Sequence, residues 1–326
     1  MLGCDALQAR YVPVPMPDPY SYDVVIWLRR AALPPDAPPP VPQVVDVPTR
    51  MGRRCLFTDV TTRSGRRLRL GTVHLESQSN SADTRQRQLE LILPALKTSP
   101  WAPTSRALLA ANQAELERLK QEKAFFDGDT AKAPAEEAAA LPLPEIAVLT
   151  GDFNLCSRWE AENRIVAQDP DVTDLWPELE AGPGWTEDTK INEMRYFVKP
   201  QHKQVRFDRV LLIRPGGAVE GGAAPEPEPE PSAAGGEAGW RGERIALLGT
   251  SALPFTTADP ELPDAAPAPA AEGGLQLTLD DDGGRELRVW PSDHFGLVAD
   301  ISAEGGGAAA KASQQEPRSH EGRHQQ

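Results

Sequence analysis

One stretch of this sequence ends a short apolar run with two residues that could activate a water molecule. Residues 146–149 have the length and composition of a buried strand, and the chain then turns at Gly151. Asp152 and Asn154 follow, and residues two apart leaving a strand point the same way. A carboxylate beside a carboxamide can orient a water and take its proton, or hold a metal ion. The same residues also form ordinary turns after strands, so both interpretations stay open at this point.

Two further segments place histidines beside acids or hydroxyls where a strand begins or ends. His74 is followed by Glu76 and Ser77 in the segment HLES. Asp293 and His294 are adjacent in the segment PSDHFG, just before another apolar run. A single histidine is more often structural than catalytic, but a pair placed on either side of the GDFN turn favours a catalytic site.

Four segments together resemble a known family. HLES, GDFNL, RFDR and PSDHFGL occur in the order and approximate spacing typical of the endonuclease/exonuclease/phosphatase superfamily, and within it they are most similar to the tyrosyl-DNA phosphodiesterase 2 family. The resemblance covers residues 20–95 and 145–301, with interruptions. It implies an α/β protein with the DNase I-like fold, a four-layered α/β sandwich with two mixed β-sheets.

The resemblance also implies roles for individual residues. Asp152 and Asn154 would hold the attacking water. Asp208, in the RFDR segment, would orient His294, which would stabilise the charged transition state. His74 would donate to a phosphate oxygen. Without the other motifs, an ion pair between Asp208 and its neighbouring arginines would be the simpler interpretation.

Metal ligands and substrate contacts follow from the same resemblance. Asp293, Asp152 and Asn154 are expected at a Mg²⁺ ion, with Mn²⁺ as a substitute. Ser77, Trp185 and Arg206 are expected to contact the substrate. The implied reaction is hydrolysis of a 5′-phosphotyrosyl-DNA or related phosphodiester bond in DNA repair, with DNA or a protein–DNA adduct as the partner. An alternative is a phosphodiesterase or phosphatase of the same fold acting on a phosphoinositide, nucleotide or phospholipid.

Several positions depart from the family's pattern. Glu187 stands where the family has a tryptophan, with Trp185 two residues earlier, and Cys156 stands where it has an arginine. These positions would contact DNA, so they bear on the substrate more than on the reaction. The family's strands with a metal-site asparagine and glutamate have no counterpart before residue 20. We therefore expect an N-terminally incomplete domain, which is either active or a catalytically dead remnant that acts as a binding protein.

Composition limits the remaining possibilities. The 326 residues could form one large α/β domain or two small ones, but 33 prolines, 26 glycines and a net charge of −14 indicate that a sizeable part lies outside a core. No apolar run reaches the roughly 18 residues that a spanning helix needs. The N-terminus carries no secretion signal, and the three cysteines have no metal-ligand spacing. These features predict a nuclear or cytoplasmic protein.

The chain divides into three parts by composition. We expect a proline-rich segment over 1–19, the domain over 20–301 with disordered insertions at about 100–144 and 215–286, and a disordered tail over 302–326. Residues 215–290 hold fourteen acidic residues against four arginines, which supplies −10 of the net −14. The overall acidity therefore says little about the catalytic face.

Periodicity predicts the main elements of the domain. Strands are expected over 22–30, 50–60, 67–75 and 205–213, helices over 81–96, 107–126 and 159–166, a linker over 33–48, and short ordered pieces at 245–248, 275–279 and 287–290. Residues 50–87 hold nine arginines against three acidic residues, a balance of +6. A solvated strand face and a phosphate-facing surface explain this excess equally well.

Overall fold

The computed structural model of this chain describes residues 5–17, 23–98, 143–156, 159–198, 200–215, 239–250, 276–278, 286–288 and 292–303. The predicted helix over 107–126 and most of the predicted tail and of both predicted insertions lie outside these ranges. Within the insertion predicted over 215–286, the described residues 240–248 and 276–278 are strands, and residues 302 and 303, predicted as tail, end another strand. The disorder expected for the other residues of these segments is not addressed by the described ranges.

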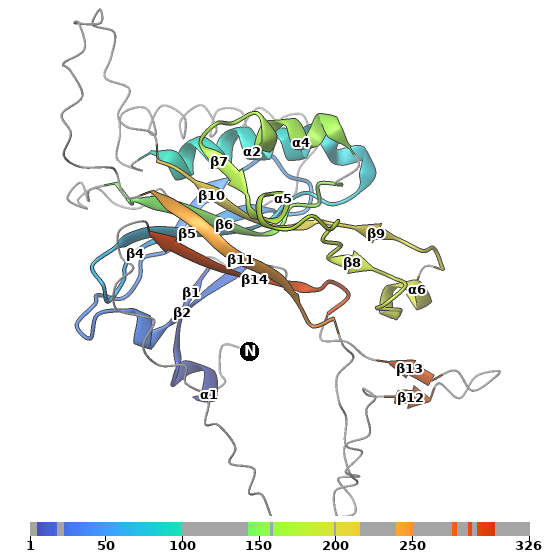
Figure 1. The fold of residues 1–326 in the computed structure, drawn as a ribbon, viewed down its shortest axis with the longest axis horizontal. Helices are drawn as coiled ribbons and strands as arrows, with labels where there is room; N and C mark the ends of the chain where they lie inside the picture. The colour runs from blue at the N-terminus through green and yellow to red at the C-terminus, as the bar shows by residue number, and fades with distance from the viewer. Residues whose placement is uncertain are drawn as a thin grey trace, which may run out of the picture.

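A six-stranded mixed sheet forms the centre of the fold (Figure 1). Only one neighbouring pair in it is parallel, β5 with β6, and the other pairs are antiparallel. Because parallel strands run the same way, the HLES and GDFN segments leave the sheet at one edge, with His74 in register with Asp152. In the order in which they lie side by side, the strands are β3 (Gln43–Asp46), β4 (Arg54–Thr61), β5 (Arg67–His74), β6 (Ile146–Asp152), β10 (Asp208–Ile213) and β7 (Val172–Asp174).

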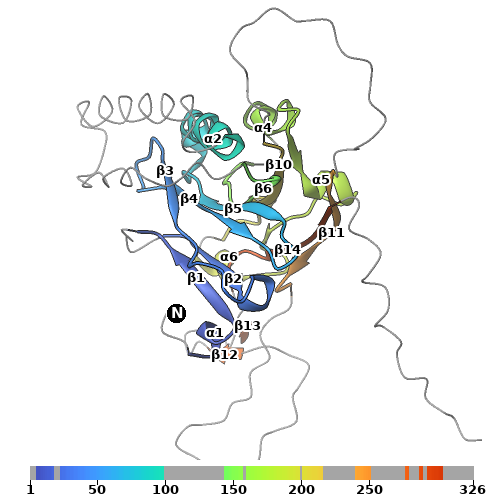
Figure 2. The same ribbon diagram turned by 90° about the vertical axis from the view of Figure 1, so that its left-hand side faces the viewer.

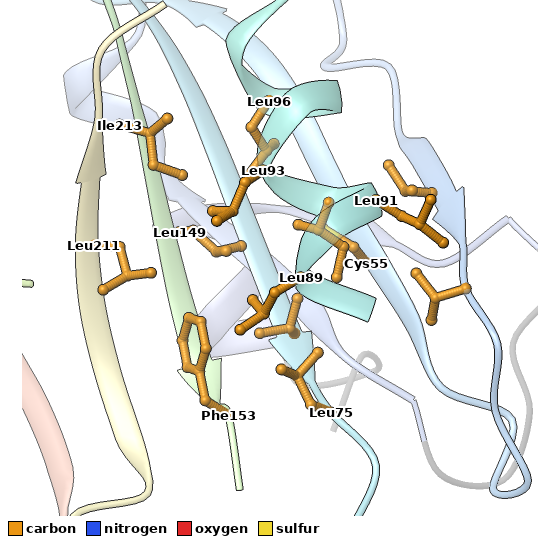
Figure 3. Packing of buried hydrophobic residues seen from close by; sticks show 14 of the residues in the cluster. Cys55, Leu75, Leu89, Leu91, Leu93, Leu96, Leu149, Phe153, Leu211 and Ile213 are labelled. Atoms are coloured by element: carbon orange, nitrogen blue, oxygen red, sulfur yellow. The ribbon is translucent and has the colours of Figure 1, made fainter. Parts of the chain in front are cut away.

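Helices α2 (Ala82–Lys97) and α4 (Glu160–Ala167) cover one face of this sheet (Figures 1 and 2). The helix predicted over 81–96 is confirmed as α2, and its apolar residues Leu89, Ile92, Leu93 and Leu96 are all buried. Figure 3 shows these leucines above side chains of β6 and β10. Burying a leucine contributes about 1.5–3 kcal/mol, so this helix is a main stabiliser of the sheet.

Two separate antiparallel strand pairs form the layer on the other face. β1 (Tyr11–Pro15) pairs with β2 (Val25–Arg29), and β11 (Trp240–Leu248) pairs with β14 (Gly296–Ala303). Ile245 of β11 packs into a cluster with Val148 and Leu212 of the central sheet. A third pair, β12 (Gln276–Thr278) with β13 (Glu286–Arg288), and a fourth, β8 (Glu187–Asp188) with β9 (Gln204–Val205), complete the strands.

The predicted mixed α/β fold is thus confirmed, while its second layer differs from the prediction. Within the described ranges the second layer is two strand pairs that share no ladder, instead of a second mixed sheet. The linker predicted over 33–48 is wrong in part. Its end forms β3, where β-branched Val44 and Val45 pair with β4 and Val45 is buried.

The remaining helices are short. They are α1 (Asp5–Gln8), α5 (Leu175–Leu179) and α6 (Met194–Val198), with 3-10 turns η1 (Arg30–Ala32) and η2 (Ser79–Ser81). In the described part of the chain, no helix has the length and apolar character needed to cross a membrane.

Candidate active site

The ends of β5 and β6 approach each other closely enough to share a catalytic centre. A side chain at Gly151 would place its Cβ 2.0 Å from the backbone oxygen of Val73, and its φ is +129°, so only glycine fits there. This approach brings His74 Nε2 to 3.4 Å from Asp152 Oδ2. The sheet itself therefore assembles the first two groups of the site.

The turn after β6 fixes Asp152 and joins it to the HLES segment. The backbone N–H of Asn154 donates to Asp152 Oδ1 at 2.7 Å, and Asn154 has a φ of 50°, a left-handed conformation that asparagine tolerates. The side chain of Asn154 donates from Nδ2 to the Leu75 backbone oxygen and to Ser77 Oγ. Asp152 and Asn154 thus form the turn after β6 and also belong to the candidate site.

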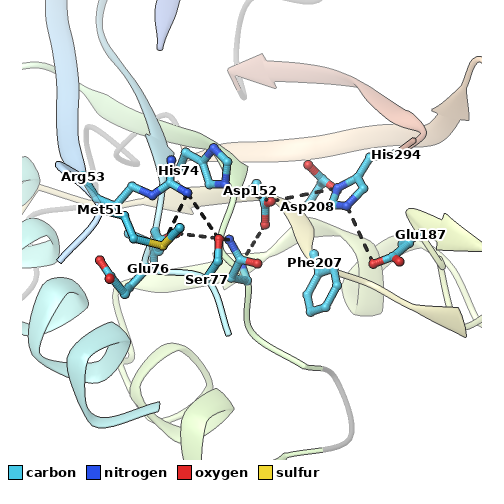
Figure 4. A network of polar contacts seen from close by, with 12 residues as sticks. Met51, Arg53, His74, Glu76, Ser77, Asp152, Glu187, Phe207, Asp208 and His294 are labelled. Carbon is cyan, nitrogen blue, oxygen red and sulfur yellow. Dashed lines mark hydrogen bonds and ion pairs between the residues drawn. The ribbon is translucent and has the colours of Figure 1, made fainter. Parts of the chain in front are cut away.

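His294 enters the site from the segment that precedes β14. Its Nδ1 lies 2.9 Å from Asp208 Oδ2 and 4.0 Å from Asp152 Oδ2 (Figure 4). Asp208 and Asp152 are direct partners in the β10–β6 register, so the sheet also sets the spacing between the two carboxylates. Three segments far apart in sequence converge on one centre.

A small unit around β8 positions the histidine. The Thr186 backbone oxygen accepts from the N–H of Phe295, and the Thr186 hydroxyl accepts from the N–H groups of Phe207 and Asp208. Asn192 donates to the backbone oxygen of Ser292. Thr186 therefore binds both the strand that carries Asp208 and the segment that carries His294.

The two histidines of the site have very different pKa values. Burial favours the neutral form of His294, but the hydrogen bond and charge of Asp208, with the charge of Asp152, outweigh it and raise its pKa to about 9. Burial and the charge of Arg53 lower the pKa of His74 to about 4. At neutral pH, His294 is a cation and His74 is neutral.

The pKa of Asp152 is raised toward neutral pH. Burial and the neighbouring charge of Asp208 raise the pKa of Asp152 to about 6, against the charge of His294 and the hydrogen bond from Asn154. A carboxylate with a pKa of about 6 accepts a proton more readily than an ordinary aspartate. The arrangement can take a proton at Asp152 while His294 presents positive charge.

No protein-family model matches this chain, and no curated protein sequence does. Solved structures do. TDP2 of D. rerio, complexed with a single-strand DNA product, is 20% identical with a TM-score of 0.49 over 90% of this chain and 78% of that one. Truncated TDP2 of Caenorhabditis elegans is 15% identical, with a TM-score of 0.48 over 91% and 77%.

An endonuclease/exonuclease/phosphatase family protein of Bacteroides thetaiotaomicron is 12% identical, with a TM-score of 0.42 over 90% of this chain and 74% of that one. The structural neighbours of this chain are TDP2 and other endonuclease/exonuclease/phosphatase proteins. At these identities and scores, the choice of a reaction has to rest on the site itself.

The remaining residues expected from the endonuclease/exonuclease/phosphatase resemblance lie at different distances from this centre. The Ser77 hydroxyl accepts from Asn154 and, at 3.2 Å, from Arg53 Nη2, so it belongs to the site. Arg206 is buried and binds Asp174 at 2.8 Å, at the end of β7. Trp185 is half-buried and lies two residues before Glu187.

Asp293 and Glu76 have other side-chain partners. The side chain of Asp293 is 51% exposed, and its carboxylate lies 3.7 Å from Arg195 Nη1. Glu76 is buried and accepts from the Thr49 hydroxyl and the backbone N–H of Arg50, which ties the HLES segment to the turn before β4. Glu76 is therefore a structural residue.

Two site residues were not singled out as site candidates from the sequence, Arg53 and Glu187. Arg53 is 5% exposed and lies beside Ser77 (Figure 4). It was only one of the nine arginines over 50–87, of which five form ion pairs elsewhere: Arg54–Asp23, Arg66–Glu145, Arg69–Asp59, Arg85–Glu162 and Arg87–Glu90. Glu187 had been noted only as a departure from the family's tryptophan, and it lies 3.8 Å from His294 Nε2.

The donor set fits a divalent cation. Asp152, Asp208 and His294 each have one possible ligand atom, and these atoms lie within 4.8 Å of one another, but His294 can bind a metal ion only after it loses its proton. Two carboxylates beside a turn that carries a carboxamide provide the oxygen donors that Mg²⁺ and Mn²⁺ prefer.

Proposed function

We propose that this protein is a nuclear or cytoplasmic phosphodiesterase that hydrolyses a 5′-phosphotyrosyl-DNA or related phosphodiester bond. One observation carries the proposal. A protonated histidine, held through Nδ1 by Asp208, lies 4.0 Å from a carboxylate whose pKa is raised to about 6. A fixed cation beside a carboxylate that can accept a proton suits attack of water on a phosphorus centre.

The residues divide the reaction between them. Asp152 accepts a proton from the water whose oxygen forms the new bond to phosphorus, and Asn154 fixes the Asp152 carboxylate. His294 donates from Nε2 to a phosphate oxygen as negative charge develops, while His74 donates to another oxygen. The bond that breaks joins phosphorus to the leaving oxygen. A tyrosine leaves readily as its phenolate, since its pKa of about 10 is far below that of an alkyl alcohol.

Mg²⁺ or Mn²⁺ would be held by Asp152 with Asn154 and either Asp293 or Asp208, and when bound it neutralises phosphate charge. Ser77, Trp185 and Arg206 remain the proposed substrate contacts. Ser77 already lies in the hydrogen-bond network of the site. Arg206 would first have to release Asp174.

The first test is release of tyrosine from a 5′-phosphotyrosyl oligonucleotide in the presence of Mg²⁺. We expect turnover in the wild type, loss of it in EDTA, and a fall of about 10³-fold in Asp152→Asn, because the variant cannot accept a proton. Asp169→Asn is the matched control, since Asp169 binds Lys97 at the C-terminal end of α2. Equal turnover in Asp152→Asn and the wild type would contradict the proposal.

A further inference from the structure

Glu187 is a buried carboxylate beside Nε2 of His294. Its side chain is 1% exposed, and its Oε2 lies 3.8 Å from His294 Nε2 (Figure 4). Asp208 already holds the other nitrogen, Nδ1. The imidazole therefore has a carboxylate near each nitrogen, and Nε2, whose carboxylate is the more distant one, is the nitrogen left to bind a phosphate.

Two cations hold Glu187 in place. Arg195 Nε and Lys203 Nζ each lie 2.8 Å from one of its two oxygens. Neither Glu187 oxygen has an aligned hydrogen bond within the described residues, so attraction between charges holds the carboxylate. Asp293, 3.7 Å from Arg195, offsets part of this positive charge. Arg195 and Lys203 are thus engaged with carboxylates of the protein.

A substrate phosphate at His294 must lie close to Glu187. An oxygen that accepts from Nε2 lies about 2.8 Å from it, which leaves the phosphate oxygen and Glu187 Oε2 no more than about 7 Å apart. That separation is shorter than the screening length in physiological salt, about 8 Å. Each negative charge on the phosphate is therefore repelled by Glu187, and Arg195 and Lys203 weaken this repulsion.

We propose that Glu187 selects substrates by charge, admitting a phosphodiester with one negative charge at His294 and disfavouring a phosphomonoester with two. The inference rests on the proposed function, since it assumes that a phosphate binds at His294. It narrows that function, because the fold and the catalytic groups alone do not separate the two ester classes. A purely structural Glu187, which only anchors α6 and the segment before β9, would affect both ester classes equally.

Binding of two small anions separates these possibilities without any need for turnover. Dimethyl phosphate carries one negative charge, and monomethyl phosphate carries two at pH 8, above its second pKa of about 6. Their dissociation constants can be measured in EDTA from the shift of the His294 ring signals in NMR spectra. In Glu187→Gln, we expect the affinity for monomethyl phosphate relative to dimethyl phosphate to rise about tenfold.

Asp188→Asn is the matched control. It removes a carboxylate from the next residue of β8, and Asp188 binds Gln204 and the backbone of Lys190 instead of facing His294. The ratio of the two affinities should stay at its wild-type value in this variant. An equal change for both anions in Glu187→Gln, or the same change in Asp188→Asn, would overturn charge selection by Glu187.

A second variant, expected to change the ratio of the two affinities in the opposite direction, keeps the inference testable if Glu187→Gln does not fold. Arg195 is 43% exposed, so Arg195→Gln should fold, and it leaves Glu187 with less neutralising charge. The preference for dimethyl phosphate should then increase. A decrease would overturn the inference. Failure of both anions to bind any of the proteins would overturn the proposed phosphate site as well.

Discussion

Asp152 and His74 end two parallel strands inside the six-stranded sheet, whereas His294 lies in a segment held by the two-residue strand β8. The first half of the site is supported by a continuous hydrogen-bonded ladder and by the buried face of α2. The second half is held by the polar contacts of Thr186 and Asn192, by the buried side chain of Phe295 and by stacking of His294 on Phe207. The proposed reaction needs the two halves correctly positioned relative to each other, although the first half is held by many more interactions than the second.

This difference indicates which part of the site opens locally. Regions with few buried apolar contacts open locally at a lower free energy than core strands do. We expect the Asp152 half to stay ordered in any folded molecule. The position of His294 should depend on its own ion pair with Asp208 and on β8.

The largest effect is expected at the first half, from Gly151→Ala. The added Cβ would meet the Val73 backbone oxygen at 2.0 Å in a conformation that L residues rarely adopt, so β5 and β6 must separate. We expect a loss of about 4 kcal/mol or more in the free energy of unfolding, measured by denaturant titration. Gly65→Ala is the control. Its φ is +81° but nothing lies within 4 Å, so the loss should be about 1–2 kcal/mol. Equal losses would contradict the close approach of the strands.

The second half can be tested by pH. The pKa of His294 is about 9 in the folded protein and about 6.5 when unfolded, so the folded state binds the proton more tightly. The resulting stabilisation is fully present below pH 6.5 and is lost as the pH rises through 9. A shift of this size corresponds to about 3 kcal/mol as an upper value. The pKa of Asp152 is raised from 3.8 to about 6, so its contribution to stability is also lost as the pH rises, but between about pH 4 and 6.

Asp208→Asn should remove most of this pH dependence, because it takes away the hydrogen bond and charge that favour protonated His294. The measurement is the free energy of unfolding between pH 6.5 and 9, in EDTA, for the variant and the wild type. We expect the two curves to converge as the pH approaches 9. Parallel curves across this range would mean that Asp208 does not hold His294 in solution.

The same contrast explains which features could be predicted from the sequence. The GDFN and HLES segments carry strong local signals, a short apolar run that ends in polar residues, and the sheet places both segments at one edge. The helix over α2 was predictable because its leucines recur at helical spacing. The roles of Glu187 and Arg53 were not predictable, because each is set by partners from distant segments, and a buried charge has no local signature. Strand β3 was missed because its short Val-rich run lies between prolines.

The smallest expected effect is the stabilisation of the folded protein by a divalent cation. It shows which half of the site binds the ion. The family resemblance predicts Asp152, Asn154 and Asp293 as ligands, whereas the geometry brings together Asp152, Asp208 and His294. Both sets contain Asp152. An ion that binds the folded state with a dissociation constant near 1 mM should stabilise it by about 1.4 kcal/mol at 10 mM Mg²⁺. The rise in melting temperature on adding Mg²⁺ measures this effect.

Asp152→Asn should abolish the Mg²⁺-dependent rise in melting temperature under either ligand set, and Asp169→Asn should leave it unchanged. The two sets differ in the remaining variants. The exposed carboxylate of Asp293 binds Arg195, while that of Asp208 faces the centre of the site, so we expect Asp208→Asn to lose the rise and Asp293→Asn to keep it. The reverse result would place the ion with the His294 segment. In that case the loosely held half of the site would be ordered by the metal, and the contrast between the halves would apply only to the metal-free protein.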